Sequence, residues 1–155
     1  LGKMVKESLV NNKVQVSSSA PFTLYVGPEE TTQRTASFTA GTRSAEYTLT
    51  TAASFELRSG NLPTLLQDRI EVQRTYAHNQ NNVTGSGQEE SLLREEMRRD
   101  LVMQLMMRLQ AVTPTQLEAL KEQAQRKAQA EADAREAAIR AQQFDEPQQS
   151  PITLP

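Results

Sequence analysis

The chain has 155 residues, a net charge of -2, a single histidine and no cysteine. The lack of cysteine excludes disulfides, thiolate nucleophiles and thiolate metal sites, and one histidine argues against an all-protein zinc site. So small a net charge gives no overall attraction for nucleic acid. The length predicts one main domain, and the sequence has no apolar run long enough to predict a membrane-spanning helix. We expect no cofactor and no metal.

The first ten residues predict a short helix. Its apolar side chains share one helical face, and they are Leu1, Met4, Val5 and Leu9. Asn11 and Asn12 follow, and asparagine tolerates the left-handed backbone conformation that often ends a helix. We therefore expect a left-handed asparagine at the end of this helix.

An interrupted strand is predicted next. Residues 14–16 suggest a brief extended piece, and the alternation of apolar side chains over residues 22–26 starts a strand. Gly27 and Pro28 interrupt this strand before it resumes near Thr32. Because proline cannot donate a backbone hydrogen bond to a neighbouring strand, the interruption predicts a kink or a bulge.

The clearest local signal is a β-hairpin. Residues 35–51 read T-A-S-F-T-A-G-T-R-S-A-E-Y-T-L-T-T, which is two alternating strands around one tight polar turn. The second strand, over residues 44–58, places these side chains on one side: Ala45, Tyr47, Leu49, Thr51, Ala53, Phe55 and Leu57. Serine and threonine occupy most of the other side. The pattern predicts a sheet that is covered on one face and exposed to water or a partner on the other.

A third long strand and a polar loop follow the hairpin. A turn over residues 59–63 leads to a strand over residues 69–78, and residues 79–87 predict a loop. Within this loop, Gly85-Ser86-Gly87 lacks the Lys-Ser/Thr of a phosphate-binding loop, so we interpret it as a turn in which Ser86 caps the next helix. His78 has no cysteine or G-x-S-x-G serine as a catalytic partner, which favours a structural or surface role over that of a general base.

Residues 88–111 predict an amphipathic helix. Its apolar stripe consists of Leu93, Met97, Leu101, Leu105 and Leu109, widened by Val102 and Met106. We expect the stripe to pack on the sheet face that carries Tyr47, Leu49, Phe55, Ile70 and Val72. The methionines at 103, 106 and 107 either fill the core, which we favour, or form an adaptable binding surface. Glu90 with Arg94 is an i, i+4 pair, as is Glu95 with Arg99, and we interpret both as a solvated helix face.

A second long helix is predicted from its cap. Thr113, Pro114 and Gln116 form a Thr-x-x-Gln capping box with proline at the first helical position. The helix is rich in alanine and charged nearly all round through residue 143, so we expect residues 122–143 to pack little. These elements predict a domain over residues 1–112, a charged helix over 113–143 and a flexible tail over 144–155. The fold class is α+β, a two-layer sandwich of a mostly antiparallel sheet with two helices on one face, plus the extended C-terminal helix.

Two predicted loops meet at one end of this domain. If strands 44–58 and 69–78 are antiparallel neighbours, the strand end near His78 lies beside Ser44. The hairpin tip and the loop before the long helix then share one pole, which also receives the positive end of the helix dipole. With Arg43 on the tip, this pole is a hypothesis for phosphate binding, and the alternative is an ordinary set of exposed loops.

Four segments resemble a known family in order and spacing. They are T-Q-R-T-A-S-F-T-A-G-T-R-S-A-E-Y-T-L-T-T, S-F-E-L-R, E-V-Q-R-T-Y-A-H-N-Q-N-N-V-T-G-S and L-R-E-E-M-R-R-D-L-V-M-Q-L-M-M-R-L-Q. The chain from about Leu1 to Val112 is similar to the lipopolysaccharide-assembly lipoprotein family LptE, once called rare lipoprotein B. The family's lipobox cysteine and first strand are absent from this sequence, so we expect the chain to be incomplete at its N-terminus, with an exposed sheet edge.

The resemblance implies a function without catalysis. It implies an outer-membrane lipoprotein that is anchored on the periplasmic face through an upstream lipidated cysteine, plugs the LptD β-barrel and assists lipopolysaccharide assembly. The candidate contacts for lipopolysaccharide or a partner are Arg34, Thr39, Thr42, Arg43, Arg74, His78, Asn79 and Asn82. The alternative is a periplasmic module that binds a small ligand or a peptide along an open sheet edge.

Overall fold

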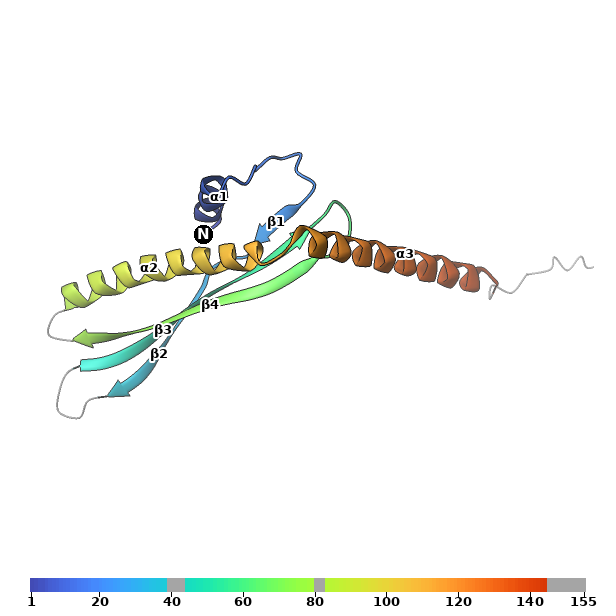
Figure 1. The fold of residues 1–155 in the computed structure, drawn as a ribbon. Coiled ribbons are helices and arrows are strands. Elements are labelled where there is room, and N and C mark those ends of the chain that lie inside the picture. The colour runs from blue at the N-terminus through green and yellow to red at the C-terminus, as the bar shows by residue number, and fades with distance from the viewer. Residues whose placement is uncertain (39–43, 80–82, 145–155) are drawn as a thin grey trace, which may run out of the picture.

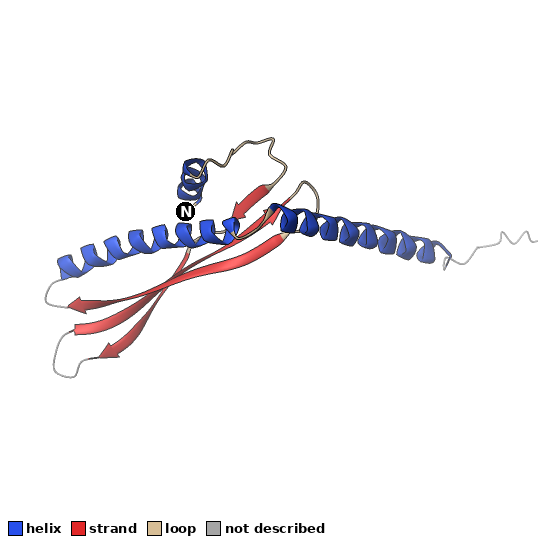
Figure 2. Ribbon diagram, viewed as in Figure 1, coloured by secondary structure: helices blue, strands red, loops and turns tan. Residues whose placement is uncertain are grey.

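The computed structural model describes residues 1–38, 44–79 and 83–144 as helices and strands around one sheet (Figure 1). In chain order the elements are α1 (Gly2–Asn11), β1 (Thr23–Val26), β2 (Glu30–Phe38), β3 (Ser44–Arg58), β4 (Leu66–Asn79), α2 (Val83–Gln110) and α3 (Pro114–Phe144). Helices α1 and α2 lie on the same side of the antiparallel sheet (Figure 2). The expected α+β class is confirmed.

Strand β3 is the centre of the sheet. On one side β4 runs antiparallel to it along its whole length, from the pair Ser44 and Asn79 to the pair Leu57 and Leu66. On the other side β1 and β2 follow one another along the same strand. The predicted hairpin and the predicted third strand are therefore neighbours, as the sequence indicated.

The interruption between β1 and β2 is a bulge. From Val26 to Glu30 the chain advances four residues, whereas the partner strand advances three, from Phe55 to Ala52. The Gly27 amide donates to the Ser54 carbonyl at 2.8 Å, and a Cβ on Gly27 would lie only 3.2 Å from the same oxygen. The predicted kink or bulge is confirmed, and the close approach of the two backbones explains the glycine.

The core lies between α2 and one face of β3 and β4, which we call the inner face. Its least exposed large side chains are Leu49, Phe55, Met97, Leu101 and Leu105. Val5 of α1 joins the same cluster together with Ile70, Val72, Tyr76, Val102 and Met106. The apolar stripe of α2 therefore packs where its spacing predicted. Met106 is buried in this core, whereas Met103 and Met107 are each 55% exposed, so core filling accounts for only one of these three methionines.

A buried tyrosine ties α2 to β4. The Tyr76 hydroxyl donates to Glu90 Oε2 at 2.9 Å, and the Arg94 guanidinium donates to Glu90 Oε1 at 2.6 Å. Burial, followed by the hydrogen bond to Glu90, raises the pKa of Tyr76 from 10.0 to about 12. Both predicted i, i+4 pairs form, and the pair of Glu95 with Arg99 is solvated as expected. The interpretation of Glu90 as part of the same solvated face is wrong, because Glu90 also binds Tyr76 of the sheet.

Three further ion pairs link the same helix to the sheet, and the longest of them joins Arg108 to Asp68 of β4 at 3.4 Å. Arg98 Nε lies 2.7 Å from Glu29 Oε2, and Glu29 belongs to the bulge between β1 and β2. Arg74 of β4 pairs with Asp100 of α2 at 2.5 Å. Because these partners are far apart in sequence, periodicity along a single helix could not pair them.

Two predicted helix termini and one predicted strand need correction. Asn12 ends α1 with a φ of -85°, and its side-chain amide donates to the Ser8 carbonyl. The left-handed residue is the next one, Lys13, with a φ of 63°. Residues 14–16 form no strand. Helix α2 begins at Val83, so Ser86 lies within it and not at its cap. Each residue added to an existing helix gains a backbone hydrogen bond, which offsets the roughly 1 kcal/mol cost of a glycine.

Helix α3 starts at the predicted capping box. The Thr113 amide donates to Gln116 Oε1 at 2.9 Å, and the Gln116 amide donates back to Thr113 Oγ1 at 3.2 Å. Ala124 is only 6% exposed, so the helix packs one turn further than its last leucine, Leu120. A small side chain permits this close approach. Residues 129–142 are exposed.

Replacing Leu101 with alanine tests the core. Leu101 is 0% exposed, so we expect Leu101→Ala to lower the free energy of unfolding by about 2 to 5 kcal/mol. Urea denaturation followed by circular dichroism measures this. The control Met103→Ala changes a side chain that is 55% exposed on the same helix, and we expect a change of at most about 0.5 kcal/mol. Equal midpoints for Leu101→Ala and the unchanged protein would contradict this packing.

Replacing Tyr76 with phenylalanine tests the link to Glu90. At pH 8 we expect Tyr76→Phe to cost about 1.5 kcal/mol, because it removes a hydrogen bond to a charged group. The folded-state pKa is raised, so this tyrosine's contribution is present below pH 10 and is lost as the pH rises from 10.0 to about 12. The stability difference between the two proteins should therefore shrink across that window. Tyr25→Phe, at a position 51% exposed, is the control; a pH-independent difference for Tyr76→Phe would contradict the link.

Candidate binding face of the sheet

The sheet has a second face, which we call the outer face. Side chains alternate along a strand, so Thr48, Thr50 and Ala52 of β3 point away from the core that holds Leu49 and Phe55. None of the helices within the described ranges covers this face (Figure 2). The sequence predicted such an uncovered polar face from its serine and threonine residues.

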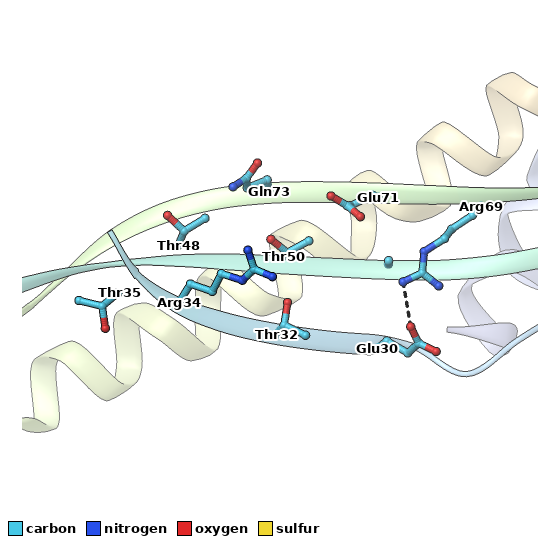
Figure 3. Close-up of a pocket in the computed structure, with 10 residues that line it drawn as sticks. Glu30, Thr32, Arg34, Thr35, Thr48, Thr50, Arg69, Glu71 and Gln73 are labelled. Carbon is cyan, nitrogen blue, oxygen red and sulfur yellow. Dashed lines mark hydrogen bonds and ion pairs between the residues drawn. The ribbon is translucent and has the colours of Figure 1, made fainter. Parts of the chain in front are cut away.

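The outer face is hollowed. A depression of about 470 Å³ lies over β2, β3 and β4 (Figure 3). Ten residues line it, namely Glu30, Thr32, Arg34, Thr35, Thr48, Thr50, Ala52, Arg69, Glu71 and Gln73. The right-handed twist of the long strands accounts for a concave surface here. The lining contains no large apolar side chain, so the depression suits hydrogen bonding and not apolar burial.

An ion pair crosses the central strand at one end of the depression. Arg69 of β4 pairs with Glu30 of β2 at 2.8 Å, so the pair spans β3. Ala52 of β3 is the direct partner of Glu30 in the sheet, and it is only 2% exposed although it is on the outer face. A larger side chain at this position would block the path of the arginine. Alanine among threonines is thus explained by the pair that covers it.

Arg34 and the threonines form the other end. Arg34 is exposed and forms no ion pair with any side chain in the described part of the chain. Its side chain points over the middle of the sheet, toward Thr50 (Figure 3). Thr48 and Thr75 lie within hydrogen-bond distance through their hydroxyls, at 3.4 Å. Arg34 therefore presents a charged donor beside a row of hydroxyl groups that both donate and accept.

Comparison with known proteins decides the family. The model of the lipopolysaccharide-assembly family LptE matches residues 1–109. The chain belongs to this family. A solved structure of rare lipoprotein B from Shewanella oneidensis has a similar fold, with a TM-score of 0.59 and 23% identity over 71% of this chain and 86% of that one. No curated protein matches the chain.

Membership of the LptE family settles the broad role. The family consists of outer-membrane lipoproteins that act in lipopolysaccharide assembly and are not enzymes. The resemblance found in the sequence is confirmed. Within the described residues, no group of three histidine, aspartate or glutamate side chains can hold a metal ion. No described helix combines the length and apolar character needed to cross a bilayer.

The structure separates two of the predicted contact residues. Arg34 lies on the outer face, whereas Arg74 lies on the inner face and pairs with Asp100. The backbones of His78 and Asn79 pair with Ala45 and Ser44, which brings the two strand ends together as expected at the pole. The remaining candidates lie outside the described residues, and they are Thr39, Thr42, Arg43 and Asn82.

Sequence reasoning missed most of the charged lining of the depression. Arg69 and Glu71 alternate with Ile70 and Val72 of the core, so period two in β4 already placed them on the outer face. The pairing of Arg69 with Glu30 required the register of three strands. The alternation of charged and apolar side chains in β4 identified the core residues, and it also contained the signal for the charged residues of the outer face.

Proposed function

We propose that this LptE-family protein sits inside the LptD-type β-barrel of the outer membrane and that its outer face contacts the barrel wall. The observation that carries the proposal is the uncovered outer face, a three-strand-wide surface of hydroxyl, amide and charged groups. Lumens of outer-membrane barrels are lined with polar side chains, so the two surfaces are chemically complementary. Family membership supports anchoring on the periplasmic face through a lipidated cysteine.

The outer face favours a polar partner over an apolar one. Its threonine hydroxyls offer donors and acceptors, and each hydrogen bond contributes about 0.5 to 1.5 kcal/mol net. Arg34 adds a charged donor that the described residues leave unpaired. A wall of polar side chains can match this pattern over a large area, whereas burial of apolar surface would contribute little.

The pole formed by the strand ends is the place we propose for lipopolysaccharide. The register brings Ser44 beside Asn79, and α2 begins only four residues further along the chain at Val83. In the sequence, Arg43 directly precedes Ser44, the first residue of β3. Lipid A carries phosphates, and a guanidinium donates paired hydrogen bonds to phosphate oxygens.

A second function rests on the edge of β4. This strand has 14 residues, contains no proline and pairs only with β3 among the described strands. Such an edge can accept an extended peptide by adding a strand. The alternative role as a peptide-binding module therefore stays open, and purification from detergent-solubilised membranes distinguishes the two. Only the plug role predicts a barrel protein in one-to-one ratio.

Thr50→Lys tests the contact with the barrel. Thr50 lies at the centre of the outer face, so a long cation there should clash with a closely packed wall and reduce the recovery of barrel at least ten-fold. Recovery is measured by co-purification at matched expression, and the unfolding midpoint is measured alongside. The control Thr115→Lys makes the same change on exposed α3. Normal recovery with Thr50→Lys would contradict contact through the outer face.

Arg43→Glu tests lipopolysaccharide contact at the pole. We expect weaker binding of purified lipopolysaccharide, with the largest difference at low salt, because each charge-assisted hydrogen bond contributes on the order of 1.5 to 3 kcal/mol. Arg140→Glu on α3 is the control with the same change of charge. Unchanged affinity for Arg43→Glu at both salt concentrations would remove this residue from the binding site and would leave the barrel contact to be judged separately.

A further inference from the structure

A second cavity lies on the opposite side of the sheet from the outer face. It has a volume of about 850 Å³ and lies among α1, the segment 12–22, β1 and the last turns of α2. Figure 1 shows this segment as an arch that leads from α1 to β1. The role in lipopolysaccharide assembly proposed above makes no use of this cavity. Its size falls within the range of about 300 to 1,000 Å³ that is typical of small-molecule sites.

Hydrogen bonds fix both ends of the arch. At its start, left-handed Lys13 lets the Val14 amide donate to the Leu9 carbonyl at 3.0 Å, while the Lys13 amide donates to Val10 at 2.9 Å. This is a Schellman motif, in which Val14 and Leu9 occupy the two positions that commonly make a hydrophobic contact. At its end, the Ser59 hydroxyl donates to the Pro21 carbonyl at 3.1 Å. The arch is therefore a formed wall of the cavity.

The walls of the cavity are mainly apolar. The floor consists of side chains that are buried or half-buried, namely Val5, Leu9, Leu24, Val26, Leu57, Met106 and Leu109. The arch contributes Val14 and Val16, which are 47% and 46% exposed. These two valines are not in the core of the protein, yet they line the cavity. A linear apolar ligand would bury them and would contact the floor at the same time.

Among the described residues, the lining of the cavity contains one cation and no anion. Lys6 is the single charged side chain among the described residues that line it. No described acidic side chain forms an ion pair with Lys6, whereas its neighbour Lys3 pairs with Glu7 at 3.9 Å. An uncompensated ammonium beside an apolar cavity is complementary to an amphiphile with a negative headgroup.

We propose that this cavity binds one fatty acid, with its acyl chain along the apolar floor and its carboxylate at Lys6. The lining comes from α1, the segment 12–22, β1, β3 and α2, and walls from several directions suit a narrow flexible chain better than a helix laid across a flat groove. The apolar floor supplies affinity and the single lysine orients the headgroup.

Displacement of a fluorescent fatty acid from the full 155-residue chain tests the proposal. Decanoate, dodecanoate and tetradecanoate are compared below their micelle-forming concentrations, and affinity should rise about four-fold for each added CH₂. Val16→Asp should weaken dodecanoate binding at least ten-fold, because it places an anion in the cavity wall. Val10→Asp is the matched control, since Val10 is 53% exposed and does not line the cavity. Equal effects of the two variants would overturn the proposal.

Charge reversal tests the headgroup. Lys6→Glu should weaken the binding of dodecanoate at least ten-fold and leave the binding of neutral dodecanol unchanged. The control Lys3→Glu makes the same change of charge on the same helix, outside the cavity lining. Equal losses for Lys6→Glu and Lys3→Glu, or an equal loss of dodecanol, would overturn the role of Lys6. Binding to vesicles of anionic phospholipid without any binding of dodecanoate would assign the protein to a membrane surface and overturn the cavity as the site. Affinity that does not depend on chain length would also overturn it.

Discussion

The packing of one long helix on one long hairpin is the constraint on which the rest of this structure depends. Helix α2 has 28 residues and strands β3 and β4 have 15 and 14. At about 1.5 Å per helical residue and about 3.3 Å per strand residue, the helix and the strands are both roughly 40 to 50 Å long. A single apolar stripe and a single apolar face can therefore meet along their whole length, and Leu101 and Leu49 are excluded from water as a result.

This arrangement leaves the other face of the sheet for a partner. A protein of this size has one core, and the inner face uses the large apolar side chains of β3 and β4 to build it. Threonine suits the outer face because its branched side chain favours a strand while its hydroxyl stays able to hydrogen-bond. Arg69 and Glu30 then brace the three strands across Ala52 without adding apolar surface. The same sheet thereby supplies both the stability of the domain and its candidate binding surface.

Polar contacts beside the apolar stripe fix how α2 lies on the sheet. An apolar interface alone tolerates sliding, since burial has no direction. Glu29, Asp100 and Glu90 each bind a partner at a defined position on the helix or the strand, and these contacts are distributed along α2. The bulge between β1 and β2 has a part in this, because it contributes Glu29. The irregular edge of the sheet thus helps to set the register of the regular helix.

The sequence by itself determined the hairpin, the apolar stripe of α2 and the start of α3. Period two identified the hairpin, spacing by four identified the stripe of α2, and Thr113 with Gln116 marked the start of α3, because each signal arises from neighbours along one helix or strand. The resemblance to the LptE family was also visible in the sequence and identified the role. Only the tertiary structure decided that Glu90 binds Tyr76, that Arg74 pairs with Asp100 of α2, and that Arg69 reaches across β3 to Glu30. The cavity beneath the arch was also decided only by the tertiary structure, because its walls come from segments that approach one another only when the sheet and helices assemble. The spacing of apolar residues along one helix or strand carries no information on how close two such segments lie.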